Sequence, residues 1–138
     1  MNIVLDTNVL IAALIARGVC HQLLEHCALR HTLFTSEFIL NEVQTTLIDK
    51  FGYSAELRSE CDSVLRSRMT VVSPLKLDNP VCRDPDDDNI LAAALVGPCD
   101  CIITGDKDLL LLKNYEGIDI YTPRDFLVNE VLDSPLQD

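Results

Sequence analysis

Short apolar runs alternate with segments of helical periodicity along nearly the whole chain, and this alternation restricts the possible folds more than any other feature. Predicted strands occupy residues 2–5, 31–35, 69–74, 99–106 and 117–122. Helices are expected at 8–16, 19–29, 54–66, 87–97 and 107–112, after Ser36 through Leu47, and from Pro123 onward. Strands separated by helices form parallel sheets with both faces covered. We therefore expect a three-layer α/β/α domain with a central parallel β-sheet.

The length and composition are those of one domain. The chain has 138 residues, of which 48% are hydrophobic and 24% are charged. This suits a single sizeable core, and it is too apolar for a disordered chain. We expect the domain to span residues 1–132, followed by a loose polar tail at 133–138.

The net charge of −11 comes from 22 acidic and 11 basic residues. The chain therefore lacks the basic surface with which a protein binds DNA or RNA passively. Its excess of acid must serve solubility, metal binding or both. The glycine-rich loops of dinucleotide and P-loop nucleotide sites are absent from the sequence.

The cysteines and the N-terminus favour a cytoplasmic protein. Asp6 interrupts the first apolar stretch, no cationic segment precedes it, and no apolar run has transmembrane length. The six cysteines contain no C-x-x-C pair and are expected to be free thiols. His21, His26 and His31 lack the helical spacing of a metal-binding pair, so we expect surface or helix-end histidines.

Carboxylates lie where the predicted strands end. Asp6 closes the first strand, Asp106 closes the fourth, and the acidic run 86–88 opens a helix. The carboxyl ends of parallel strands meet at one edge of a sheet, where binding sites form. Glu42 differs, because it lies within a helix on the same face as Phe38 and Ile39, at or beside the core.

Each of these acids also has an ordinary structural explanation. Asp6, Asp88 and Asp106 are suitable helix caps, and Glu42 suits the border of a core. Taken together, four acids from distant segments without matching cations would repel one another. Oxygen ligands without histidine or cysteine suit Mg²⁺ or Mn²⁺. The candidate ligands are Asp6, Glu42, Asp88 and Asp106, with Asp87 and Asp108 as neighbours able to replace the third and fourth.

Three stretches in this order resemble the PIN-domain family of metal-dependent nucleases. They are "NIVLDTNVLIAAL", "SEFILNEVQTTL" and "RDPDDDNILAAALVGPCDCIITGDKDLL". The resemblance extends from Met1 to about Leu127, and the third stretch is similar to the subgroup containing toxins of toxin–antitoxin systems. In this comparison Asp6, Glu42, Asp88 and Asp106 take the four acid positions.

The resemblance implies an acidic pocket that holds Mg²⁺ or Mn²⁺ and cleaves RNA. Asn8 and Thr104 are candidates for positioning ligands through hydrogen bonds, although ordinary turn chemistry explains them equally well. A homodimer is expected, both from the resemblance and from the apolar helices "VLIAALIA" and "LLLL". A separate antitoxin chain is a possible partner, and no membrane association is expected.

Two other classes of function remain open. An aspartyl-phosphate phosphatase or receiver domain also places an Asp at a strand end, but the dehalogenase type of phosphatase needs D-x-D, and Asn8 replaces the second acid. A non-catalytic acidic binding module would need no reaction at all. Trapping of a phosphorylated enzyme and RNA cleavage with and without EDTA separate these classes.

Overall fold

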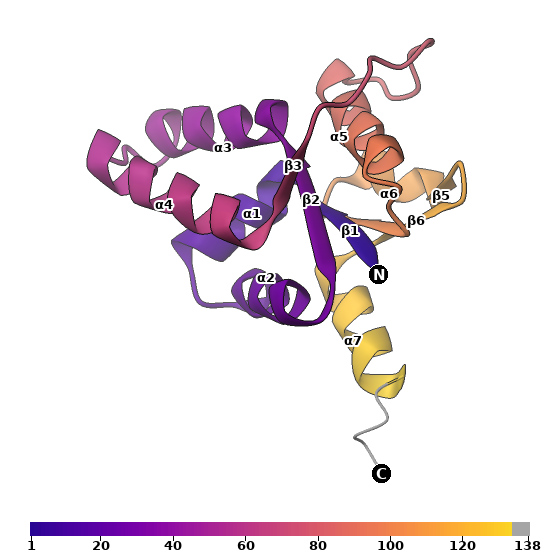
Figure 1. The fold of residues 1–138 in the computed structure, drawn as a ribbon, viewed down its shortest axis with the longest axis horizontal. Helices are drawn as coiled ribbons and strands as arrows, with labels where there is room; N and C mark the ends of the chain where they lie inside the picture. The colour runs from indigo at the N-terminus through magenta and orange to yellow at the C-terminus, as the bar shows by residue number, and fades with distance from the viewer. Residues whose placement is uncertain (134–138) are drawn as a thin grey trace.

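The fold is of the α/β class, with a mostly parallel β-sheet between two layers of helices. The computed structural model describes residues 1–133, in which a 6-stranded sheet has the order β3-β2-β1-β4-β6-β5. Figure 1 shows α1 to α4 on one side of the sheet and α5 and α6 on the other. The strands are β1 (Asn2–Leu5), β2 (Thr32–Ser36), β3 (Thr70–Val72), β4 (Cys101–Ile103), β5 (Asn114–Tyr115) and β6 (Ile118–Tyr121). The expected three-layer architecture is confirmed.

The helices cover most of the segments predicted as helical. They are α1 (Thr7–Ile15), α2 (Val19–Arg30), α3 (Glu37–Asp49), α4 (Ala55–Arg68), α5 (Pro85–Val96), α6 (Lys107–Leu112) and α7 (Pro123–Asp133). Helix α7 includes Asp133, the first residue of the predicted loose tail, and the rest of that tail, 134–138, lies outside the described residues.

Strand β1 lies in the middle of the core. Ile3, Val4 and Leu5 are fully buried, because β2 and β4 pair with β1 on its two sides and helices cover both faces. This explains why the first strand is a continuous apolar run rather than an alternating one. The carboxyl end of β1 is consequently fixed in position by neighbours on every side.

The sheet departs from the prediction at one edge. Strand β5 was not predicted, and it pairs with β6 in the antiparallel direction, whereas the other strand pairs are parallel. Its turn places Glu116 and Gly117 at positive φ, 52° and 84°, and glycine adopts this conformation readily. A two-residue strand is too short to show a periodicity in the sequence.

The side chains that precede several helices serve as N-caps. Ser36 Oγ accepts a hydrogen bond from Ile39 N at 3.3 Å, as predicted, and Ser54 Oγ accepts one from Leu57 N at 3.2 Å. Asp6, Asp84 and Asp106 cap α1, α5 and α6 in the same way. Acids therefore occupy helix starts along the carboxyl edge of the sheet.

Between residues 1 and 133, no single helix is long and apolar enough to cross a membrane. Helices α1 and α2 pass this test only when taken together, and the chain bends by 107° between them. The six cysteines are free thiols.

We predict that Gly97→Ala destabilises the fold. A Cβ at this position would lie 2.9 Å from Cγ and 3.2 Å from Cβ of Phe34, and 3.1 Å from Sγ of Cys99. Overpacking of this kind costs about 1–3 kcal/mol of unfolding free energy, measurable by urea denaturation. Gly105→Ala is the matched control, because a Cβ there meets nothing within 4 Å. Equal stability of the two variants would contradict the packing described here.

Candidate acidic active site

The pairing of β1 with β4 brings Asp6 next to Thr104. Leu5 is in register with Ile103, so the residues that follow them lie side by side at the end of the sheet. Thr104 Oγ1 donates a hydrogen bond to Asp6 Oδ2 at 2.6 Å, and Thr7 N donates to Asp6 Oδ1 at 2.7 Å. Asp6 is 5% exposed. Its carboxylate is therefore held rigidly, with further lone pairs free to bind a cation.

Thr104 also orients the turn that carries Asp106. Its hydroxyl oxygen accepts a hydrogen bond from Asp106 N at 2.9 Å. Asp106 Oδ1 in turn accepts from Asp108 N at 2.8 Å and from Leu109 N at 3.2 Å, which begins α6. Thr104 is fully buried. The suggested positioning role of Thr104 thus has a geometric basis: it joins two candidate acids.

Asp87 is the acid that α5 contributes to this group. Asp84 caps the helix and Pro85 follows it, which turns Asp87, in the first turn, toward β1 and β4. Carboxylate oxygens of Asp87, Asp106 and Asp108 lie within 4.8 Å of one another. Asp87 is 9% exposed, yet no residue within 1–133 donates a hydrogen bond to its carboxylate. Its oxygens are not sealed from solvent, so they are open to a cation as well as to water.

Asp88, the residue assigned to this position from the sequence, lies elsewhere. Its carboxylate accepts hydrogen bonds from Val81 N at 3.1 Å and from Cys82 N at 2.8 Å, and so holds the loop before α5. Successive residues of an α-helix are about 100° apart around the axis. Asp87 and Asp88 therefore cannot both face the acidic group, and the geometry favours Asp87, which the sequence analysis treated as the alternative.

Glu42 lies at the border of the group and not in the core. It is half-buried, and its Oε1 accepts a hydrogen bond from Thr7 Oγ1 at 2.8 Å. Thr7 thus connects Glu42 to Asp6 through its hydroxyl and its main-chain nitrogen. Asn8, the other proposed positioning residue, is exposed, and among the described residues its side chain has no hydrogen-bond partner.

Asp108 already has a cationic partner. Arg83 Nη2 lies 2.9 Å from both carboxylate oxygens of Asp108, and the arginine side chain is 86% exposed. The sequence analysis did not predict this pair, because the two residues are 25 positions apart. Arg83 partly neutralises the outer side of the group and leaves its inner side, at Asp87, without a cation.

The crowded carboxylates make ionisation unfavourable. Burial first, and then the charges of Asp106 and Asp6, raise the pKa of Asp87 from its ordinary 3.8 to about 7. Burial also raises the pKa of Asp6, against the hydrogen bonds from Thr104 and Thr7. Burial likewise raises the pKa of Glu42. A bound divalent cation would reverse these shifts, and an all-oxygen donor set fits Mg²⁺ or Mn²⁺.

A family profile and a relative from another organism both match this chain. The sequence profile described as "PIN domain" matches residues 2–108, which include every acid named above. An uncharacterized protein of Methanocaldococcus jannaschii, MJ1680, is 29% identical, and the match covers 92% of this chain and 90% of that protein.

Two solved structures share the fold at low identity. One is VapBC2 from Rickettsia felis bound to a DNA fragment from its promoter (TM-score 0.62, 16% identity, 87% of this chain and 97% of that chain). The other is VapBC-1 from nontypeable Haemophilus influenzae (TM-score 0.63, 17% identity, 90% of this chain and 99% of that chain). At such identities the likeness concerns the fold.

Asparagine at position 87 should stabilise the metal-free protein, and asparagine at position 88 should not. Asp87→Asn removes a charge that its acidic neighbours repel. We therefore expect the free energy of unfolding in EDTA at pH 8 to rise by about 1 kcal/mol, which is slightly less than the equivalent of one pKa unit. Asp88→Asn weakens hydrogen bonds to Val81 N and Cys82 N, so we expect a loss of about 1 kcal/mol. Urea denaturation of both variants measures these changes, and the opposite order would place Asp88 in the group.

The metal-free protein should also lose stability as the pH rises from about 4 to about 7. In that window native Asp87, with its raised pKa, retains a proton that the unfolded chain has released, so rising pH favours unfolding. Asp87→Asn should flatten this part of the stability profile. Identical slopes in the variant and the unsubstituted protein would show that Asp87 is not the source.

Proposed function

The chain belongs to the PIN-domain family, and on that premise we propose that it is a metal-dependent endoribonuclease, the toxin of a toxin–antitoxin pair. One observation carries the proposal: the Asp87 carboxylate has no hydrogen-bond donor among the described residues and lies within 4.8 Å of two further acids. Such an arrangement is costly unless a cation binds it. The family membership supports the nuclease class, and the donor set supports the metal.

Asp87, Asp106 and Asp108 would hold the metal ion, with Asp6 beside them. A divalent cation bound here supplies Lewis acidity: it acidifies a water molecule and offsets the charge of a phosphodiester. Thr104 and Thr7 fix the direction of Asp6, and Asp106 is fixed by main-chain donors of α6. Glu42, held by Thr7, is placed to orient a water or an outer ligand. These contacts keep the acids in place before any substrate arrives.

A polyanionic substrate must approach a protein of net charge −11. Metal ions would cancel several carboxylate charges at the site itself. Arg83, exposed at the rim and paired with Asp108, is suited to contact a phosphate of the RNA backbone. The substrate we propose is RNA, in agreement with the family resemblance.

The other classes receive less support. A phosphatase of the dehalogenase type needs a second acid two residues after Asp6. Asn8 occupies that position; it is exposed, and among the described residues its side chain forms no hydrogen bond with any of the acids. An acidic binding module would not need a rigidly held Asp6 and Asp87. Both classes remain outcomes of the assay below.

We predict that a long RNA is cleaved in Mn²⁺ or Mg²⁺ and that EDTA abolishes cleavage. Asp87→Asn and Asp6→Asn should each lower the cleavage rate at least about 100-fold, since removing a metal-ligand position or a fixed transition-state contact has this effect. Asp49→Asn, at the exposed C-terminal end of α3 and in contact with none of the site acids, is the control and should keep its activity.

A contaminating nuclease would be recognised by equal activity in all three variants purified in the same way. Cleavage that survives in Asp87→Asn with an unchanged metal requirement would contradict the assignment. A trapped phosphoenzyme would favour the phosphatase, and RNA binding without cleavage in saturating Mn²⁺ would favour the binding module.

We propose two protein partners: a second copy of the chain and a separate antitoxin. The solved VapBC structures support the antitoxin by their fold and name. The homodimer is argued from the exposed apolar residues alone, because Leu10, Ile11 and Leu109 are buried within the chain, whereas Leu111 and Ile15 of the same two helices are exposed. Ile15 on α1 and Val64 on α4 remain exposed and line one hollow of about 330 Å³, with Ile48, Phe51 and Leu57 also exposed.

Light scattering should give twice the monomer mass at micromolar concentration. Val64→Glu would replace an exposed apolar side chain in this hollow, which Glu25 also lines, with a second acid, and should yield monomers while preserving the fold. A monomer in the unsubstituted protein would contradict the proposed homodimer and leave the nuclease proposal intact.

A further inference from the structure

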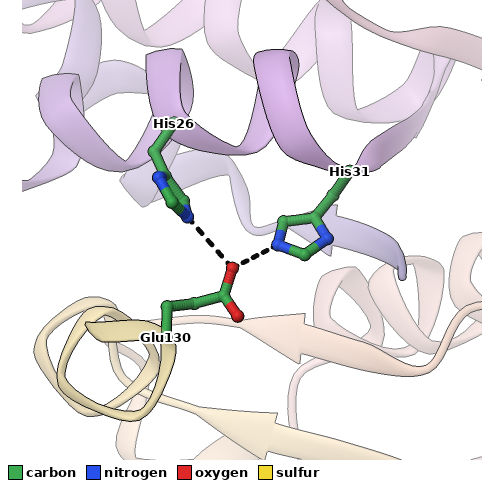
Figure 2. Close-up of side chains that lie close together, drawn as sticks. All are labelled: His26, His31 and Glu130. Carbon is green, nitrogen blue, oxygen red and sulfur yellow. Dashed lines mark hydrogen bonds and ion pairs between the residues drawn. The ribbon is translucent and has the colours of Figure 1, made fainter. Parts of the chain in front are cut away.

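A second group of metal-binding side chains lies at the junction of α2 and α7. His26 belongs to α2, His31 follows its last turn, and Glu130 belongs to α7. Figure 2 shows both imidazole rings directed at one oxygen of Glu130. His26 Nε2 lies 3.0 Å from Glu130 Oε1, and His31 Nε2 contacts the same oxygen. The nitrogens and the carboxylate oxygen all lie within 4.8 Å of one another.

The fold holds these three side chains together. Helices α2 and α7 pack against each other, and His31, the C-cap of α2, has extended backbone angles (φ −136°, ψ 177°). This change of direction brings its ring to 5.9 Å from the ring of His26, at an angle of 62°. Phe126, which is buried on α7, contacts the other side of the His31 ring, centroid to centroid 5.8 Å. The two Nε2 atoms therefore converge instead of pointing into solvent.

We propose that His26 Nε2, His31 Nε2 and Glu130 bind a zinc ion. Two imidazoles and one carboxylate are a donor set that proteins use for Zn²⁺, with a fourth position left for water. Mg²⁺ and Ca²⁺ prefer oxygen ligands, so this site and the acidic group differ in the metal that each selects. The inference does not depend on the proposed nuclease function.

A cavity beside Glu130 holds further charged groups. It has a volume of about 210 Å³ and is lined by Glu130, Asp100 and Asp119, and also by Met1, the residue whose ammonium group contacts His31. Asp100 comes just before β4 and Asp119 lies in β6, near the amino ends of those strands. Asp6 and Asp106 follow the carboxyl ends of β1 and β4. The two sites therefore lie at opposite ends of the parallel strands.

A bound zinc ion would replace two hydrogen bonds with two metal–nitrogen bonds. In the contacts described, each Nε2 donates a proton to Glu130, and the other nitrogen of His31, Nδ1, lies 3.0 Å from Met1 N. Zinc binds a deprotonated ring nitrogen, so binding should release protons and weaken in acid. The ion would join α7 to α2 and so fix the C-terminal helix against the domain.

The test uses tag-free, metal-free protein and zinc chloride as the probe. Isothermal titration calorimetry in excess Mg²⁺, which occupies the acidic group, should show one Zn²⁺ per chain with micromolar or tighter affinity. The melting temperature should rise by about 5 °C or more in excess zinc. His26→Gln and Glu130→Gln should each weaken zinc binding at least 10-fold and remove the thermal shift. Cleavage of RNA in Mn²⁺ should stay unchanged in both variants.

Two control variants exclude the other ligands of the chain. His21→Gln changes a histidine of the same helix whose Nδ1 contacts Ala13 O, and it should bind zinc normally. Asp87→Asn disables the acidic group and should also bind zinc normally. Cobalt(II) in place of zinc should give a spectrum without sulfur-to-metal charge-transfer bands, because the proposed ligands include no thiolate.

Several results would overturn the proposal. One is that His26→Gln and Glu130→Gln bind zinc as tightly as the unsubstituted protein. Another is that Asp87→Asn loses zinc binding. The remaining ones are charge-transfer bands from sulfur and the absence of any zinc binding. In each case the group would be a pair of hydrogen bonds between helices. Zinc binding lost in Glu130→Gln and kept in His21→Gln would establish the site even if His26→Gln folded poorly.

Discussion

The parallel pairing of β1 with β4 is the constraint on which the acidic site depends. It places Thr104 against Asp6, and the hydroxyl of Thr104 then serves both as a donor to Asp6 and as an acceptor for Asp106 N. Because β1 is buried on both faces and paired on both sides, Asp6 cannot move away from the acids that face it. The core thus supplies the energy that holds like charges together, and the metal ion we propose would relieve their repulsion.

The sequence predicted the architecture because apolar runs and helix caps act locally. Five of the strands and the order of helices followed from hydrophobic runs, Ser and Asp caps, and Gly or Pro stops. Strand β5 escaped because two residues carry no periodicity and its turn depends on backbone angles. The same local signals identified Asp6 and Asp106, since each stands directly after a strand and before a helix.

The choice between Asp87 and Asp88 needed three-dimensional information. Three successive acids on a helix point in three directions, and the sequence alone fixed neither the first residue of α5 nor the partners of Asp88. The cap at Asp84, followed by Pro85, was the available signal, because it sets which residues form the first turn. The pair of His26 and His31 with Glu130 was beyond such reasoning, since α7 supplies its third member from about 100 residues away.

The central claim is that the carboxylates of Asp87, Asp106 and Asp108 form a divalent metal site. Anomalous diffraction from crystals soaked in Mn²⁺ at a pH above 7, where Asp87 is able to ionise, tests it most directly. The account predicts a manganese peak bonded to Asp87 and Asp106 at about 2.2 Å, with Asp88 still bound to the main chain of the preceding loop. A peak at Asp88 with none at Asp87, or no ordered manganese at this edge of the sheet, would contradict it.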